Sequence, residues 1–494
     1  MIMQRRKIWT ATASALLLLL QYSATAQTQS ADSLISEISS GPAVTYTIQQ
    51  CIDSALRNNA AVKSYEFIAG NAQNARLQQV GNMVPSINAL AQFYNSGGKS
   101  VNTFTNQYVT QNYNQGYGQI NGSVILFNGF SLLNYLKQFS LAYEADKKDW
   151  QYQKDLMTIT IIQDYLTILA NEELLDLAER QAADNRHRVD LMAIQDTLGA
   201  IAPSALTDQK ALLNSNELTI VSTKNALEQS KLKLAQDMNI PYSPNMDVVK
   251  LNIDPTPVLY NASVDQVYQN AVHNIAAVQA AELHVEAAKK GVLATKGNMS
   301  PTLSLFYGVN TNYSSAAATN PLLNTTYSPG SSYVLIGGNQ VPVYDPQYTF
   351  GNQKIPFNTQ FKNNVYTNFG VQLSIPILNH FNYRVLYKNS IVARDQAIFN
   401  QKTINSQLRQ AVESNYVNMM QNFRTYNVTY KQVQNYEESY REAKIKSDNG
   451  AISSLDFVIY NTNRNNAELN LIAAKYSYLL AAKVLDYYQG TLTW

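Results

Sequence analysis

This sequence is poor in charge, cysteine and long apolar runs. Only 15% of its 494 residues are charged, and Cys51 is its single cysteine. One cysteine excludes an intramolecular disulfide, and its place on an amphipathic helix is typical of a small buried apolar residue. Beyond the N-terminus no stretch reaches the roughly 18 apolar residues of a spanning helix. The sequence therefore predicts no inner-membrane helix.

The chain also lacks an excess of basic residues. Arg5, Arg6 and Lys7 precede an apolar run at 8–20, and Ala24-Thr25-Ala26 follows it. This order predicts a signal peptide over 1–26, and the run is too short and too early for the alternative, a transmembrane anchor. Without these three cations the chain has 34 Lys and Arg against 35 Asp and Glu. Nucleic acid is therefore not an expected partner.

Residue patterns typical of catalysis or metal binding are absent. The sequence has no P-loop, dinucleotide fingerprint or nucleophile elbow. Its four histidines are scattered without metal-ligand spacing, and His273 and His284 are expected to be solvated. We expect no enzyme, no cofactor and no metal site. The histidines are His187, His273, His284 and His380.

The chain is a tandem duplication. Residues near Val278 repeat those 216 positions earlier, and residues after Asn379 repeat those 251 positions earlier. The second copy therefore carries an insertion of 35 residues between Pro301 and Asn379. Its Ser, Asn, Gly and Pro content predicts an exposed loop.

Each copy has one very long proline-free segment, at about 131–195 and about 384–447. At 1.5 Å per residue each would form a helix of about 95 Å, a length typical of coiled coils and solenoids. Two rotated apolar stripes, one through Leu166 and one through Tyr165, predict packing against two neighbours.

Between the long helices the apolar period changes to two. Phe369, Val371 and Leu373 alternate with polar residues, as do residues near Ile120 and Leu305. About ten alternating residues is the length of a strand that crosses an outer membrane, although a half-buried soluble sheet has the same pattern. Four strands cannot close a barrel, and open strand edges are not tolerated in a bilayer. We expect three copies to supply twelve strands.

These features resemble the TolC-like outer-membrane efflux protein family over residues 45–490. The shared features include proline-led strands, a strand-to-helix segment similar to Pro-Leu-Phe-Asn-Gly-Gly, and a helix tip with glycine and aspartate. Neither copy keeps the whole strand-to-helix segment, since Ile125 replaces proline in the first and His380 replaces glycine in the second. The junction residues are Pro85, Asn128, Gly129, Pro301, Pro376 and Asn379.

The resemblance implies a homotrimer whose twelve-stranded barrel in the outer membrane continues into a periplasmic α-helical tunnel. Its implied partners are a periplasmic adaptor, an inner-membrane pump and outer-membrane lipid. It also implies export of small molecules or proteins, and a belt around the tunnel that includes Val248, Val249, Leu251 and Ile253. The alternative is a coiled-coil structural or adhesive surface protein with a small β anchor. Interior strands in both copies favour the channel.

Gly199 and Gly450 fall where long helices reverse, and we expect these turns to form the periplasmic entrance. By the resemblance, Asp456 would lie near that entrance and favour cations there. The alternative is helix capping, because Ser453 precedes Asp456 by three residues. Ile459 stands where the family has a further acid, which favours capping. Both roles can coexist.

The expected fold class is mainly α with β, a duplicated α-helical coiled-coil barrel with four transmembrane strands per chain. The expected segments are a signal peptide (1–26), an N-terminal linker (27–43), repeat 1 (44–240, strands about 84–127), a linker (241–261), repeat 2 (262–490, strands about 300–377) and a tail (491–494).

Overall fold

The computed structural model describes residues 44–101, 106–110, 112–251 and 258–492. The predicted signal peptide, the predicted N-terminal linker and Ile253 lie outside these residues. The chain divides into two compact units. The helical unit comprises Met1–Ile68, Lys147–Gln279 and Thr403–Trp494, and the strand unit comprises Ala69–Asp146 and Ala280–Lys402.

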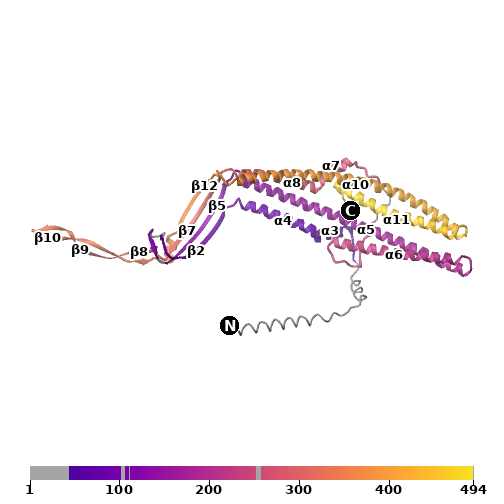
Figure 1. Cartoon of the computed structure of the whole chain (residues 1–494), viewed down its shortest axis with the longest axis horizontal. Helices are drawn as coiled ribbons and strands as arrows, with labels where there is room; N and C mark the ends of the chain where they lie inside the picture. Colours follow the sequence, from indigo (N-terminus) through magenta and orange to yellow (C-terminus); the bar gives the residue numbers. More distant parts are fainter. Residues whose placement is uncertain (1–43, 102–105, 111, 252–257, 493–494) are drawn as a thin grey trace, which may run out of the picture. The chain divides into compact units, whose positions relative to one another are not determined.

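The chain is mainly helical with some strands, as predicted, and its order of elements occurs twice (Figure 1). The two longest predicted helices are present, each 67 residues long. None of the described helices has a segment both long and apolar enough to cross a membrane. The helices of the first copy are α3 (Ile48–Asn58), α4 (Ala60–Gly81), α5 (Ser131–Thr197) and α6 (Pro203–Asp237), and those of the second are α7 (Val264–Asn274), α8 (Ala276–Gly297), α10 (Asn382–Asp448) and α11 (Ser454–Gln489).

The two copies begin with the same local structure. Thr47 caps α3 and Ser263 caps α7, in each case with a glutamine three residues later that completes a capping box. These boxes satisfy backbone N–H groups at the helix start. They lie 216 positions apart, and α5 and α10 start and end 251 positions apart. The duplication in the sequence is therefore a duplication in structure.

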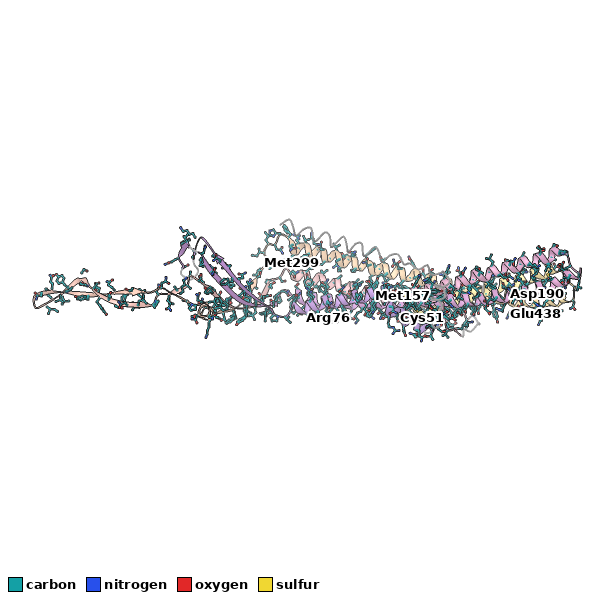
Figure 2. All side chains as sticks on the ribbon, turned by 90° about the horizontal axis from the view of Figure 1, so that it is seen from below. Cys51, Arg76, Met157, Asp190, Met299 and Glu438 are labelled. Atoms are coloured by element: carbon teal, nitrogen blue, oxygen red, sulfur yellow. The ribbon has the colours of Figure 1, made fainter. Side chains whose placement is uncertain are left out.

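Both apolar stripes of α5 enter one core of the helical unit, which also buries Ile162, Leu166 and Leu169. Ile161, Tyr165 and Ile168 are fully buried in this core, which also contains Cys51 and Met157, both labelled in Figure 2. Ile159 instead packs against a second core built around α7, α10 and α11. Cys51 is 0% exposed, and burial raises the pKa of its thiol to about 12. It is the buried apolar residue that the sequence predicted.

A short parallel pair of strands joins the start of repeat 1 to the linker. β1 (Val44–Tyr46) pairs with β6 (Met246–Val248), and the Tyr165 hydroxyl donates a hydrogen bond to the Val249 carbonyl oxygen at 2.6 Å. Val248 is buried, whereas Val249 is 40% exposed. The predicted belt residues therefore pack partly onto α5.

The strand unit contains one four-stranded antiparallel sheet in the order β12-β7-β5-β2. Each copy contributes a hairpin, β2 with β5 and β7 with β12, and the two hairpins join through β5 and β7. The sheet consists of β2 (Ser86–Ser96), β5 (Tyr113–Phe127), β7 (Thr302–Ser314) and β12 (Tyr366–Ser374).

The region of the 35-residue insertion is exposed, as predicted, but much of it is not an irregular loop. Its main part is an antiparallel ribbon that turns at Gly337 and Gly338, both with positive φ. Figure 1 shows this ribbon extending from the sheet within the strand unit. The ordered elements are β8 (Ala318–Thr319), β9 (Leu322–Ile336), β10 (Asn339–Phe350), β11 (Gln353–Lys354) and α9 (Phe357–Asn363). In the first copy the corresponding loop holds β3 (Lys99–Val101) and β4 (Tyr108–Thr110).

Candidate functional site

The four-stranded sheet carries no charged residue and has two different faces. None of its strands contains Asp, Glu, Lys or Arg. Residues opposite one another in adjacent strands share a face, so the pairings define the faces. The apolar face contains Ile87, Ala89, Ala91, Phe93, Ile120, Val124, Leu303, Leu305, Tyr307, Val309, Phe369, Val371 and Leu373. The polar face contains Asn88, Gln92, Gln119, Asn121, Ser123, Ser304, Asn310, Asn368, Gln372 and Ser374, with Leu90, Ile125 and Phe306 as apolar exceptions.

Much of the apolar face is uncovered in the single chain. Phe369 is 81% exposed and Ile87 is 73% exposed. Helix α9 packs against this face near Thr311, whose hydroxyl donates a hydrogen bond to the Phe361 carbonyl oxygen at 2.6 Å. A continuous apolar surface of this kind marks contact with another protein or with lipid.

Both edges of the sheet are also open. Among the described residues, strand β2 pairs with β5 alone and strand β12 with β7 alone. Neither edge strand contains proline, so both present a row of backbone groups that can pair with a further strand. The β9–β10 ribbon differs, because Pro329, Pro342 and Pro346 remove donors from its strands.

The predicted junction residues Asn128 and Gly129 lie where β5 meets α5. Gly129 has φ +62, and a Cβ there would lie 2.4 Å from the Ser300 Cβ and 2.7 Å from the Gly297 carbonyl oxygen. Asn128 accepts a hydrogen bond from the Leu132 backbone N–H at 3.3 Å. Only glycine fits this close approach of two backbones.

The second copy keeps the same turn without glycine. His380 has φ +56 and Phe381 has φ +61, matching Gly129 and Phe130 of the first copy. The backbone therefore follows the same turn in both copies, although histidine stands where glycine is expected in the second copy. His380 is exposed, which leaves room for its side chain.

The remaining junction residues border the strands. Pro85 and Pro301 immediately precede β2 and β7, where a fixed φ and a missing donor are tolerated. Pro376 follows β12 by two residues, and Asn379 accepts a backbone hydrogen bond from Asn382 at 3.0 Å. The Asn379 side-chain nitrogen is buried without a partner among the described residues.

Gly199 and Gly450 lie in the turns between the long helices and adopt the left-handed conformation, with φ +66 and +68. After each glycine the next backbone N–H bonds back to the helix, from Ala200 to Gln195 at 2.8 Å and from Ala451 to Lys446 at 2.7 Å. This arrangement closes the helix end and reverses the chain. No atom lies within 4 Å of a Cβ built at either glycine.

Asp456 is engaged in a helix cap. Ser453 is the N-cap of α11, and its hydroxyl accepts from the Asp456 backbone N–H at 3.1 Å. The same hydroxyl donates to the Asp456 carboxylate at 2.6 Å. The first copy has no such cap, since Ala202 precedes Pro203 there. Asp456 is exposed, so its charge is also available to solvent.

Arg464 connects three helices in the helical unit, which the sequence did not predict. Its guanidinium lies 3.7 Å from Asp184 of α5, 3.9 Å from Glu437 of α10 and 3.6 Å from Glu468 of α11. It also lies 3.9 Å from the centre of the Tyr440 ring. Glu468 is a local i,i+4 partner, but no local pattern reveals Asp184 or Glu437, because they lie on other helices.

Buried or half-buried acids on α5 are a second feature that the sequence analysis missed. Asp164 is 4% exposed and lies 3.3 Å from the Lys233 ammonium, which also binds Asp237 at 2.6 Å. Burial raises the pKa of Asp164 to about 7. Burial opposes ionisation of Asp237 too, but hydrogen bonds from Asp164 and Lys233 outweigh it and lower the Asp237 pKa.

Glu172 lies further along α5 and is a second acid whose pKa is raised. Burial, followed by a hydrogen bond with Asp247 and the charge of that residue, raises the Glu172 pKa to about 7. The charges of Lys250 and Lys231 oppose this shift. A signal was present for Asp164, which interrupts an apolar stripe between Ile161 and Ile168.

These acids predict a helical unit that is less stable at neutral than at acidic pH. Asp164 and Glu172 titrate at about 7 when folded and near 3.8 and 4.5 when unfolded. Between about pH 4 and pH 7 the folded protein keeps protons that the unfolded protein loses, so the free energy of unfolding falls as pH rises through this window. We expect about 1–2 kcal/mol for each carboxyl.

Thermal unfolding followed by circular dichroism from pH 4.5 to 7.5 measures this slope. Asp164→Asn should reduce it, whereas the same change at exposed Asp208 should leave it as in the wild type. Equal slopes in all three proteins would contradict the assignment.

Comparisons with known proteins found a matching family model and several similar solved structures. Residues 267–491 match the family model described as outer membrane efflux protein. The structure is similar to that of CusC, with a TM-score of 0.70 and 15% identity over 90% of this chain and 92% of that chain. It is also similar to VceC from Vibrio cholerae (TM-score 0.67, 13% identity, 90% and 96% covered). A third similar structure is MtrE from Neisseria gonorrhoeae (TM-score 0.67, 14% identity, 90% and 88% covered). No curated protein matches the sequence.

Proposed function

We propose that this chain, whose resemblance to the TolC-like outer-membrane efflux proteins is confirmed over residues 267–491, forms an outer-membrane efflux channel as a homotrimer. In this proposal, three four-stranded sheets close a twelve-stranded barrel. The helices of the three chains form a tunnel in the periplasm. In this proposal export through the channel is passive, and the inner-membrane pump supplies the energy.

The observation that carries the proposal is the uncharged, two-faced sheet with both edges open. Its apolar face suits lipid and its polar face suits a water-filled lumen. Open strand edges in a bilayer leave backbone groups without partners, so the sheet requires neighbours. Four strands per chain and three chains give a barrel with an open lumen.

The partners in this proposal are a periplasmic adaptor and an inner-membrane pump, which pass small molecules or proteins to the tunnel. MtrE is described as an outer-membrane channel, and CusC is described in terms of transmembrane channel formation. Extending those descriptions to this chain is part of the proposal. The repeats over 44–240 and 262–490, with the linker over 241–261, are the units from which each tunnel wall is built.

We assign the periplasmic entrance to the helix turns at Gly199 and Gly450, with Asp456 beside the second turn. Three-fold symmetry would place three exposed Asp456 carboxylates around the axis, where they favour cations. The same carboxylate accepts the Ser453 hydroxyl, so capping and selectivity share one residue.

Two substitutions separate these roles. Asp456→Asn keeps an oxygen acceptor for Ser453 and removes the charge, so we expect lower cation preference with little loss of stability. Ser453→Ala keeps the charge and removes the cap, at an expected cost of about 1 kcal/mol. Reversal potentials in a salt gradient and thermal unfolding measure the two effects. An unchanged reversal potential in Asp456→Asn would leave only the capping role.

The channel itself is tested by mass and conductance. Protein extracted in detergent should have the mass of three chains and should give stepwise currents in a planar bilayer. A monomer without conductance would overturn the proposal and support the adhesive surface protein with a β anchor.

A further inference from the structure

The helical unit contains a cavity to which the proposed function assigns no role. Its volume is about 470 Å³, within the range of about 300–1,000 Å³ that is typical of small-molecule sites. Helices α4, α5, α8, α10 and α11 all contribute to its lining, and every lining residue belongs to the helical unit. We propose that this cavity binds an organic cation of drug size between tyrosine rings and a carboxylate. The inference goes beyond the proposed function, because binding to one chain requires neither a trimer nor transport.

The cavity is rich in tyrosine. Tyr65 comes from α4, Tyr152 from α5, and Tyr487 and Tyr488 from the end of α11. The ring centres of Tyr487 and Tyr488 lie 5.4 Å apart, with 52° between the ring planes. The face of a tyrosine ring attracts a cation within about 6 Å of its centre, and the attraction grows when water is excluded. Tyrosines gathered around one cavity therefore favour a cationic ligand.

The charge of the lining has the sign that a cation requires. Asp149 of α5 is the charged residue in the described lining, which contains no Lys and no Arg. A second acid of α5, Asp155, lies close by, because its charge, after burial, raises the pKa of both Tyr152 and Tyr487. A field that opposes ionisation of these hydroxyls also opposes an anionic ligand and attracts a cation.

Two bases on the same helices are engaged outside the cavity. The Lys154 ammonium lies 4.3 Å from the centre of the Trp150 ring. The Arg409 guanidinium of α10 binds the Glu413 carboxylate at 2.9 Å. Neither base belongs to the lining. The described lining therefore supplies no cation of its own to oppose its carboxylate.

The remainder of the lining is mainly apolar, which favours an organic ion over a metal ion. Ile275, Val278 and Leu408 line the cavity and are each less than 10% exposed. They would remove apolar parts of a ligand from water, but they offer no oxygen to replace the water shell of a hard metal ion. The Tyr487 hydroxyl is buried without a partner among the described residues. A ligand with a polar group beside it would relieve the cost of that unpaired hydroxyl.

Tetraphenylphosphonium and tetraphenylborate test the preference for positive charge, because these two ions are similar in size and shape and opposite in charge. Isothermal titration of the full chain in detergent should show a saturable site for tetraphenylphosphonium. Tetraphenylborate should show none. Both ions also enter detergent micelles, so titrations into the same detergent without protein are subtracted.

Three substitutions locate the site, and a fourth is the matched control. Asp149→Asn removes the charge and keeps the shape, so tetraphenylphosphonium should bind about tenfold more weakly. Asp176→Asn makes the same change at an exposed acid of α5 outside the lining and should leave binding as in the wild type. Ala411→Phe places a ring in the cavity and should abolish binding. Tyr65→Leu, at a residue 37% exposed, should weaken binding about threefold and keeps the test valid if Ala411→Phe does not fold.

The outcomes separate the cavity from the channel. Equal affinity of the wild type for the two ions would overturn the preference for a cation. Unchanged binding in folded Asp149→Asn and Tyr65→Leu, or in folded Ala411→Phe, would overturn the site. These titrations do not measure conductance or the number of chains. A monomer by mass with the expected changes in binding would overturn the proposed channel and leave the cation site in place.

Discussion

Val371→Arg should abolish accumulation of the trimer. Val371 lies on the apolar face of edge strand β12 and is 61% exposed in the single chain. If that face contacts lipid, an arginine near the middle of the bilayer costs about 2–4 kcal/mol. Three copies would carry this cost together. Trimer recovered from outer membranes and resolved on a native gel measures the loss.

Gln372→Arg is the matched control, because the next residue along β12 lies on the polar face. Here the arginine would face the lumen, so the trimer should form in normal amount. Three added cations should shift the channel toward anions, seen as a change of reversal potential. Equal trimer yields from Val371→Arg and Gln372→Arg would contradict the assignment of lipid and water to the two faces.

Gly129→Ala should destabilise the first strand–helix junction far more than any change at its counterpart. The new Cβ would lie 2.4 Å from Ser300 and the residue would keep φ +62. The left-handed backbone and the steric overlap together should lower the free energy of unfolding by about 2–4 kcal/mol. The loss should appear as a lower unfolding temperature and a lower yield of folded protein.

His380→Gly provides the comparison at the equivalent position. Glycine adopts the left-handed conformation without strain, which stabilises the folded protein, but it also gives the unfolded chain more conformational freedom. These effects oppose each other, so the free energy of unfolding should change by no more than about 1 kcal/mol. Similar effects of Gly129→Ala and His380→Gly would show that the close approach at Gly129 does not decide the preference for glycine.

Much of the helical architecture could be predicted because its signals are local and long. The proline-free segments predicted the two 67-residue helices to within a few residues, and residues of both stripes on α5 are buried in one core. Period-two alternation gave the sheet strands, since one face is apolar and the other polar. Resemblance to a known family then supplied the expected number of chains, which one sequence cannot contain.

The β9–β10 ribbon was missed although a signal was present. Gly337-Gly338 between alternating apolar residues is a hairpin pattern, but prolines and a polar composition favoured an irregular loop. The contacts of Arg464 with Asp184 and Glu437 could not have been predicted, because these carboxylates come from two other helices. His380 shows the reverse case, where a departure in sequence leaves the backbone turn unchanged.

Among the described residues, the β9–β10 ribbon occurs in the second half of the chain, whereas the long helices and the strand hairpin occur in both halves. In the proposed trimer, six similar helix reversals approximate a hexagonal arrangement at one end, since both halves of each chain contribute one. The insertion occurs in only one half, so the outer rim has strictly triangular symmetry. An antibody or phage that binds the ribbon would find three identical sites per proposed trimer. A molecule that binds the helix turns would find six sites of two kinds.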